Sequence, residues 1–280
     1  MGKLCDKMTQ DLQLRGYATS TIERYIDCSR AFAKYHMRSP EDMGEPEVRQ
    51  FLLHLLLERK TGPATRTMHV AAMKFLYQHT LGRPEVAAAI PWPKTDQKLP
   101  DILSGTEVDQ VLAAIKDVKH RALVLTTYGA GLRVSEVCAL KASDIDSKRM
   151  LIHVRHGKGA RDRYAPLAKQ VLGTLRLYFK QQRPDGPDLF PGVTPKAVRK
   201  SLHDAARAAG LDKRVTPHVL RHTFATHLLE LGTDIRVIQM LLGHRSIRTT
   251  TRYARVTDRH IQATTSPADV KGARRRKKLG

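Results

Sequence analysis

A proline-rich interruption divides this sequence into two parts. Residues 91–100 read Pro-Trp-Pro-Lys-Thr-Asp-Gln-Lys-Leu-Pro, with three prolines, three charged residues and no apolar periodicity. Proline fixes φ and lacks an amide donor, so this composition is typical of an exposed, stiff linker rather than of a helix or a strand. A chain of 280 residues also exceeds the usual size of one domain. We therefore expect two domains joined by this linker; one large domain is the alternative.

Short amphipathic helices are expected before the linker. The clearest begins at Ser20, where Ser20 and Glu23 match a capping box ahead of spaced apolar residues. Similar periodicity predicts helices through residues 48–56 and 70–77, and no strand pattern occurs in this part of the sequence. The first ninety residues are therefore expected to form a small helical bundle.

Further helices and a single strand pair are expected after the linker. Ser104 and Glu107 form another candidate capping box, which opens a helix. Residues 150–155 and 163–167 have the pattern of two strands joined by a glycine-containing turn, and helical periodicity returns from about residue 168. The predicted fold is therefore mainly α, with a small antiparallel β-sheet in the second part.

The balance of charge points to a polyanionic partner. Lys and Arg total 49 against 27 Asp and Glu, which gives a formal charge of +22. An anionic membrane is the competing surface, but the sequence has no apolar run of about 18 residues and no secretory leader. Aromatic residues make up only 5% of the chain and show no close spacing suited to stacking on unpaired bases. Duplex DNA is therefore the favoured partner.

The cysteines indicate a reducing compartment. Cys5, Cys28 and Cys138 are odd in number, far apart and without paired spacing, so neither a disulfide framework nor a zinc site is expected. We expect a cytoplasmic protein. The last ten residues hold six Lys or Arg, a pattern that favours a solvated basic tail over a specific reader of DNA.

Two basic residues in glycine-containing segments are candidates for binding a phosphate. Gly129 and Gly131 are expected to end one helix, so that Arg133 opens the next with Glu136 one turn on. A guanidinium at a helix start can grip a phosphate bidentately; a surface Arg133 paired with Glu136 is the alternative. Lys158 lies between two glycines at the tip of the predicted hairpin, where it could approach a ligand closely or be an ordinary turn residue.

A histidine and an arginine share one face near the start of a later predicted helix. His218 and Arg221 are three residues apart. The alternative is that this polar face is only solvated, an interpretation that suits His222 and His227. The spacing of His218 and His222 also occurs in zinc-binding helices, but the Glu that follows the first His of a metalloprotease helix is Val219 here. A zinc site is therefore not expected.

The last candidate segment carries a histidine and a tyrosine. Gly243 is expected to end a helix and Ser246 to cap the next one, which places His244 in the turn between them. Tyr253 follows on that next helix. Taken alone, it is most simply interpreted as a core or surface tyrosine.

Taken together and in this order, these segments resemble the tyrosine recombinase (lambda integrase) family, especially its compact Xer-like and transposon-borne members. The resemblance covers essentially the whole chain. Five short motifs in register carry it: Gly131-Leu-Arg133-Val-Ser-Glu136, Gly157-Lys158-Gly159, His218-Val-Leu-Arg221, Leu242-Gly243-His244, and Tyr253 nine residues after that His. The resemblance implies a SAM-like core-binding domain over residues 1–90, a linker over 91–100, a mixed α+β catalytic domain over 101–265 and a basic tail over 266–280.

The resemblance also implies a reaction, in which a tyrosine attacks a DNA phosphodiester and forms a 3′-phosphotyrosyl intermediate without any cofactor or metal. The catalytic set that it implies is Arg133, Lys158, His218, Arg221, His244 and the nucleophile Tyr253, with Glu136 in support. Two arginines suit the charge that develops on the phosphate oxygens, and an activated tyrosine is needed because an unperturbed phenol titrates near pKa 10.

The expected partner is double-stranded DNA with inverted-repeat recombination sites. By the same resemblance, four subunits exchange strands through a Holliday junction at the nucleoid, and a related recombinase is a further candidate partner. Two alternatives differ in activity: a type IB topoisomerase that relaxes supercoils as a monomer, and a non-enzymatic DNA-binding protein on the same scaffold. The compact length favours recombination over the topoisomerase, and the presence of all five active-site motifs argues against the non-enzymatic protein.

Overall fold

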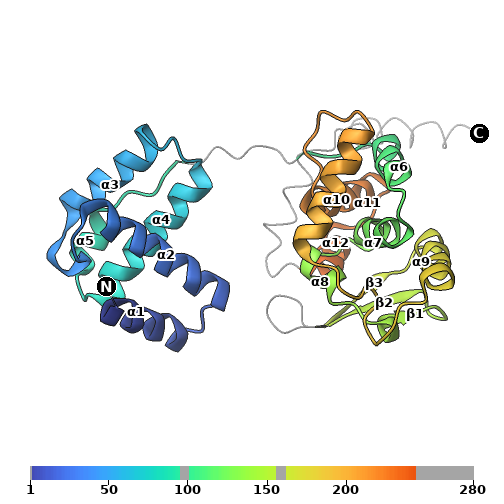
Figure 1. Cartoon of the computed structure of the whole chain (residues 1–280), viewed down its shortest axis with the longest axis horizontal. Coiled ribbons are helices and arrows are strands. Elements are labelled where there is room, and N and C mark those ends of the chain that lie inside the picture. Colours follow the sequence, from blue (N-terminus) through green and yellow to red (C-terminus); the bar gives the residue numbers. More distant parts are fainter. Residues whose placement is uncertain (1, 95–100, 156–161, 244–280) are drawn as a thin grey trace, which may run out of the picture. The chain divides into compact units, whose positions relative to one another are not determined.

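The chain forms two compact units. The computed structural model describes residues 2–94, 101–155 and 162–243. Contacts between residues divide the chain into Met1–Lys98 and Leu99–Gly280. Figure 1 shows both units.

The first unit is a helical bundle, as the sequence predicts. Its helices are α1 (Gly2–Leu14), α2 (Thr19–His36), α3 (Glu45–Leu57), α4 (Pro63–Phe75) and α5 (Pro84–Ala89), with a 3-10 turn at Pro40–Asp42 and a π-helical turn at Leu76–Thr80. The apolar stripes of these helices meet in one core, where Met8, Leu12, Phe32 and Tyr77 are almost fully buried. Helix α4 packs along α2, with α1, α3 and α5 around them.

The capping box expected at Ser20 is wrong. Helix α2 begins at Thr19 with Ala18 as its N-cap, and no side chain caps it. The amides of Thr21 and Ile22 donate to the carbonyl oxygen of Ala18 at 2.8 and 3.1 Å. These backbone hydrogen bonds enclose Ser20 within the first turn, so the Ser20 hydroxyl has no N-cap position to fill.

The second unit is helical with a small sheet at one end (Figure 1). Its helices are α6 (Gly105–Ala114), α7 (Val118–Gly129), α8 (Val134–Cys138), α9 (Lys169–Gln182), α10 (Pro195–Ala208), α11 (Pro217–Glu230) and α12 (Ile235–Leu242), with a 3-10 turn at Ala142–Asp144. Helix α7 packs against both α9 and α11. The capping box predicted at α6 is confirmed, because the Glu107 amide donates to Ser104 Oγ at 3.2 Å and the Ser104 amide to Glu107 Oε2 at 2.7 Å.

The sheet contains three antiparallel strands in the order β1 (Ile145–Asp146), β2 (Leu151–Val154) and β3 (Arg163–Pro166). The predicted pair of strands is confirmed. Strand β1 was not predicted, because its two residues are too few to show a strand pattern. Ile152 pairs with Ala165, and both are fully buried. Strand β3 also contacts α12, so the hairpin lies beside the last helix that the structure describes.

Candidate active site

The junction between α7 and α8 brings the first candidate arginine against α11. Gly131 has φ +60°, and a Cβ atom there would lie 2.3 Å from Cδ1 of Phe224 on α11. Only glycine adopts this conformation without strain and leaves room for the aromatic ring. The chain can therefore turn tightly between α7 and α8 while it packs on α11, which puts Arg133 next to that helix.

Arg133 is the N-cap residue of α8, as the sequence predicts. Its backbone amide donates to Glu136 Oε2 at 2.8 Å, and its Nη1 donates to Oε1 of the same carboxylate at 2.7 Å. The side chain of Arg133 remains 29% exposed, whereas that of Glu136 is 5% exposed. The buried Glu136 carboxylate thus orients Arg133 and leaves part of the Arg133 guanidinium accessible to a ligand.

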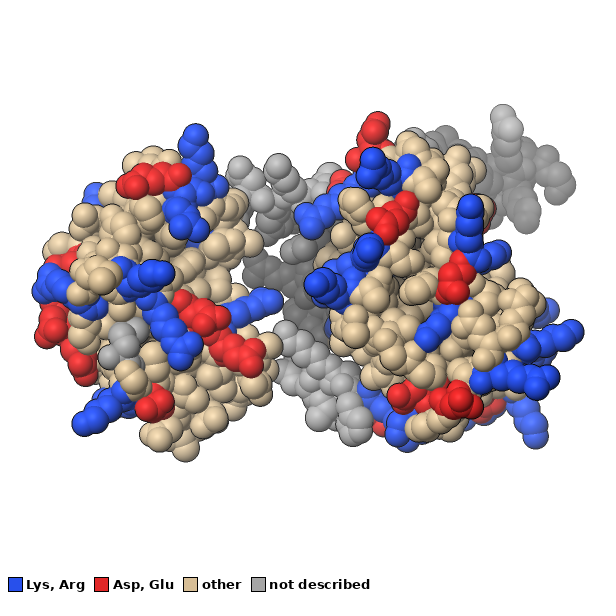
Figure 2. Space-filling model, viewed as in Figure 1, with Lys and Arg blue, Asp and Glu red and all other residues tan. Residues whose placement is uncertain are grey.

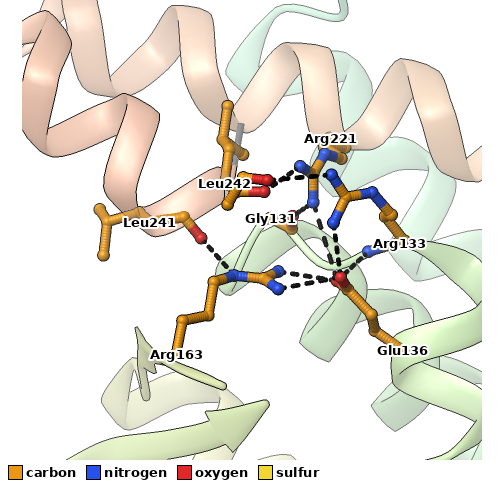
Figure 3. Close-up of polar contacts among 8 residues, drawn as sticks. Gly131, Arg133, Glu136, Arg163, Arg221, Leu241 and Leu242 are labelled. Atoms are coloured by element: carbon orange, nitrogen blue, oxygen red, sulfur yellow. Dashed lines mark hydrogen bonds and ion pairs between the residues drawn. The ribbon is translucent and has the colours of Figure 1, made fainter. Parts of the chain in front are cut away.

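The second candidate arginine, Arg221, is buried rather than solvated. It lies on α11, which begins after the N-cap Thr216, and is 2% exposed. Its Nη1 donates to the carbonyl oxygen of Gly131 at 2.8 Å, and its Nη2 donates to the carbonyl oxygen of Leu242. The same Nη1 lies 3.7 Å from Oε2 of Glu136. Figure 3 shows Arg133 and Arg221 converging on the same carboxylate from different helices.

A third arginine, Arg163, was not predicted from the sequence. Together with Arg133, Arg221 and Glu136 it forms a group of charged side chains that we call the cluster. Its Nη1 and Nη2 donate to the two carboxylate oxygens of Glu136 at 2.9 and 2.7 Å, and its Nε donates to the carbonyl oxygen of Leu241 at 2.8 Å. One signal could have found it. Strand alternation places Arg163 on the same face as the buried Ala165, and an inward-facing arginine needs a buried acidic partner.

These three arginines also hold the C-terminal end of α12. The carbonyl oxygens of Leu241, Leu242 and Gly243 accept hydrogen bonds from Arg163, Arg221 and Arg133 respectively. The last carbonyl groups of a helix have no partner within it and carry partial negative charge, so cations stabilise them. Gly243 ends the helix with φ +60°, as its predicted role as a terminator requires.

The electrostatics of the cluster favour an anionic ligand. Burial alone would raise the pKa of Glu136, but hydrogen bonds from Arg163 and from the Arg133 amide lower it to about 2, so it is ionised at neutral pH. One carboxylate therefore faces three guanidinium groups. The excess positive charge can bind a phosphate group, with the fork of an arginine matched to two of its oxygens.

The histidines of α11 are not a solvated face. His218 is exposed, but its Nε2 lies 2.8 Å from Nε2 of the buried His222, and the two rings meet edge to face. His227 hydrogen-bonds to the Tyr128 hydroxyl at 2.8 Å and to the carbonyl oxygen of Leu103 at 3.0 Å. The solvated interpretation of His222 and His227 is therefore wrong.

The structure thus brings together Arg133, Glu136 and Arg221, and it places His218 one turn before Arg221 on α11. The other three candidates, Lys158, His244 and Tyr253, lie outside the described residues. Within the part of the chain that the structure describes, no group of three or more His, Cys, Asp or Glu side chains could hold a metal ion. None of the described helices combines the length and apolar character needed to cross a membrane.

Comparison with known proteins identifies the family. Residues 101–260 match the phage integrase family, and residues 4–85 match the phage integrase N-terminal SAM-like domain. The chain belongs to the phage integrase family. A putative integrase/recombinase, y4qK of Sinorhizobium fredii, is 41% identical over 277 residues, which cover 96% of this chain and 90% of that protein. The tyrosine recombinase XerA of Pyrococcus furiosus is 37% identical over 271 residues, with 92% and 91% covered.

Solved structures agree with this assignment. A crystal structure of XerA recombinase matches with a TM-score of 0.55 and 28% identity, over 93% of this chain and 96% of that one. The Tn1549 transposon integrase, solved in complex with transposon right end DNA, matches with a TM-score of 0.73 over 98% of both chains; at 18% identity it shows the shared fold.

Membership of the phage integrase family, with tyrosine recombinases among the relatives, makes this chain a tyrosine-type site-specific recombinase that cleaves and rejoins DNA. The topoisomerase alternative and the non-enzymatic alternative are not favoured.

Proposed function

We propose that this integrase-family chain binds duplex DNA and recombines it through covalent attack by Tyr253, with Arg133 and Arg221 holding the scissile phosphate. The observation that carries the proposal is the cluster around Glu136, where two arginines far apart in sequence meet beside a single buried carboxylate. Removing a guanidinium from water is costly, so a site that buries Arg221 with surplus positive charge fits an anionic substrate better than a purely structural role.

The chemistry follows from the charge that develops on the phosphate. The Tyr253 oxygen forms a bond to phosphorus while the bond to the 5′ oxygen breaks, and extra negative charge gathers on the non-bridging oxygens. Arg133 and Arg221 stabilise that charge. His218 and His244 can donate to the same oxygens, and His218 is the better candidate to accept the phenol proton.

We assign Lys158 as the residue that donates a proton to the leaving 5′ oxygen. The product is a 3′-phosphotyrosyl intermediate that conserves the energy of the phosphodiester. A 5′ hydroxyl from another strand can then attack it and reseal the DNA without ATP.

The positions of the described neighbours support roles for Lys158 and His244. Lys158 belongs to the segment that connects β2 to β3, and β3 begins with Arg163 of the cluster. His244 directly follows Gly243, whose carbonyl oxygen accepts from Arg133 at 3.4 Å. Both candidates are therefore tethered in sequence to residues that touch the cluster.

We further assign residues 1–90 as a core-binding domain, 91–100 as the linker, 101–265 as the catalytic domain and 266–280 as a basic tail. Lys and Arg side chains are spread over both units on the face drawn in Figure 2, with Asp and Glu between them. This distribution suits phosphate contacts from each domain. The assembly that we propose is a tetramer on inverted-repeat sites in the nucleoid, formed with copies of this chain or with a related recombinase.

The test is covalent capture on a nicked suicide substrate that carries the natural site, taken from inverted repeats in the DNA flanking the gene. Cleavage releases a short strand beyond the nick, so the covalent intermediate accumulates. We expect the wild-type chain to form this complex and Tyr253→Phe to bind the same DNA without forming it. A covalent complex with Tyr253→Phe would overturn the assignment of the nucleophile.

A further inference from the structure

The side chain of Arg163 is largely buried, and its guanidinium contacts Glu136 and the end of α12. Its side chain is 8% exposed, and its guanidinium donates to both oxygens of Glu136 while its Nε donates to Leu241 (Figure 3). Gly243 packs directly on it, since a Cβ atom at Gly243 would lie 3.3 Å from Cδ of Arg163. Each of the three guanidinium nitrogens of Arg163 therefore already donates a hydrogen bond within the protein.

The pairing of Arg163 with Glu136 determines how the carboxylate acts on the other two arginines. Arg163 makes a two-point contact with Glu136, whereas Arg133 makes one side-chain contact at 2.7 Å and Arg221 lies 3.7 Å away. If Arg163 were removed, Glu136 would satisfy its charge with Arg133 and Arg221 alone. Their guanidinium groups would then be drawn onto the carboxylate and would compete less well for a phosphate.

Arg163 also joins three segments of the candidate site. It begins β3, at the base of the hairpin that carries Lys158, and it bonds to α8 through Glu136 and to the end of α12 through Leu241. A planar fork with a third donor at Nε fixes these segments at defined angles, which an ammonium group could not do. Loss of Arg163 would therefore change charge and geometry together.

We propose that Arg163 is a positioning residue of the recombinase: it occupies the Glu136 carboxylate and anchors α12, so that Arg133 and Arg221 remain available to the scissile phosphate. The inference rests on the proposed function, because it assumes that those two arginines bind the phosphate. It assigns Arg163 no contact with DNA.

The test compares Arg163→Met with the double variant Arg163→Met/Glu136→Gln in single-turnover cleavage of the suicide substrate at saturating protein. We expect Arg163→Met to cleave on the order of 100-fold more slowly than wild type, since small misplacements of catalytic groups have effects of this size. Affinity for the site should change little. The double variant should cleave faster than Arg163→Met, because the carboxylate that draws Arg133 and Arg221 away from the phosphate is gone.

A matched control separates this role from a general loss of stability. Arg155→Met removes another arginine–carboxylate pair, in which Arg155, directly after β2, donates from Nε to Asp144 Oδ1 at 2.5 Å, and this pair does not touch Glu136. Arg155→Met should cleave at the wild-type rate. The double variant also keeps the test valid if Arg163→Met folds poorly, since it removes Glu136 together with Arg163 and so keeps the net charge of the wild-type site.

Wild-type cleavage by Arg163→Met, or a double variant no faster than Arg163→Met, would overturn the positioning role while leaving the proposed function intact. Failure of the wild-type chain to form any covalent complex would instead contradict the proposed function, and the inference would fall with it.

Discussion

Replacing Gly131 with alanine should destabilise the second unit in two ways, through backbone strain and through a steric conflict with Phe224. Gly131 has φ +60°, and an added Cβ would lie 2.3 Å from Cδ1 and 2.6 Å from Cε1 of Phe224. A left-handed conformation costs alanine about 1–2 kcal/mol, partly offset by about 0.4–1 kcal/mol through the unfolded chain. Forcing the Phe224 ring aside adds about 1–3 kcal/mol.

Gly210→Ala is the matched control, because Gly210 has φ +69° and a Cβ atom added there would meet nothing within 4 Å. Both substitutions share the backbone cost, so their difference reports the conflict with Phe224. We therefore expect Gly131→Ala to lower the unfolding free energy about 1–3 kcal/mol more than Gly210→Ala. Arg221 should also move, since its Nη1 donates to the Gly131 carbonyl oxygen.

The assay is urea unfolding monitored by pulse-labelled hydrogen exchange and mass spectrometry. Peptides from α7 and α11 report the second unit, and peptides from α2 serve as an internal reference in the first. This resolution matters because a two-domain chain need not unfold in one step. Coincident unfolding midpoints for Gly131→Ala and Gly210→Ala would refute the close packing of the α7–α8 turn on Phe224.

Two further predictions concern the charges of the site. The pKa of Glu136 is about 2 against an ordinary 4.5, so the unfolded chain takes up a proton first on acidification; the stability from this group is present above pH 4.5 and is lost as the pH falls toward 2. Glu136→Gln should therefore flatten the dependence of the urea midpoint on pH across that interval, and an unchanged slope would contradict the buried ion pairs. Lys158→Ala should bind DNA normally and cleave about 100-fold or more slowly. A substrate with sulfur in place of the 5′ bridging oxygen, a leaving group that needs no proton, should restore its cleavage, and normal cleavage of ordinary DNA would remove Lys158 from the general-acid role.

Local signals in the sequence were sufficient where a short segment determines its own structure. The cap at Ser104, the turn between Gly129 and Arg133 and the helix end at Gly243 depend on neighbours within one or two turns, and the structure confirms each. Ser20 shows the limit of such signals. The N-cap of its helix is Ala18, two residues before Ser20, and no side-chain pattern signals a start at that position.

Long-range packing explains what the sequence could not predict. His227 is held by Tyr128 and Leu103, residues 99 and 124 positions away, so its helical face alone suggested solvent. Arg163 meets Glu136 across 27 positions, with no motif that links them. The fold assigns these partners only when α7, α11, α12 and the hairpin pack together. The type of reaction could be predicted because the order of the motifs along the chain indicates it. The long-range contacts that position the motif residues could not be predicted.

The role of Tyr253 as nucleophile is tested most directly by identifying the residue that becomes linked to DNA. The covalent complex trapped on the suicide substrate would be treated with nuclease and then with a protease that cleaves before aspartate. That digestion releases residues 234–257, in which Tyr253 is the single tyrosine. We expect tandem mass spectrometry to locate a nucleotide remnant joined through its 3′ phosphate to Tyr253. A remnant on any other residue, or a peptide that remains unmodified when covalent complex is present, would contradict this role.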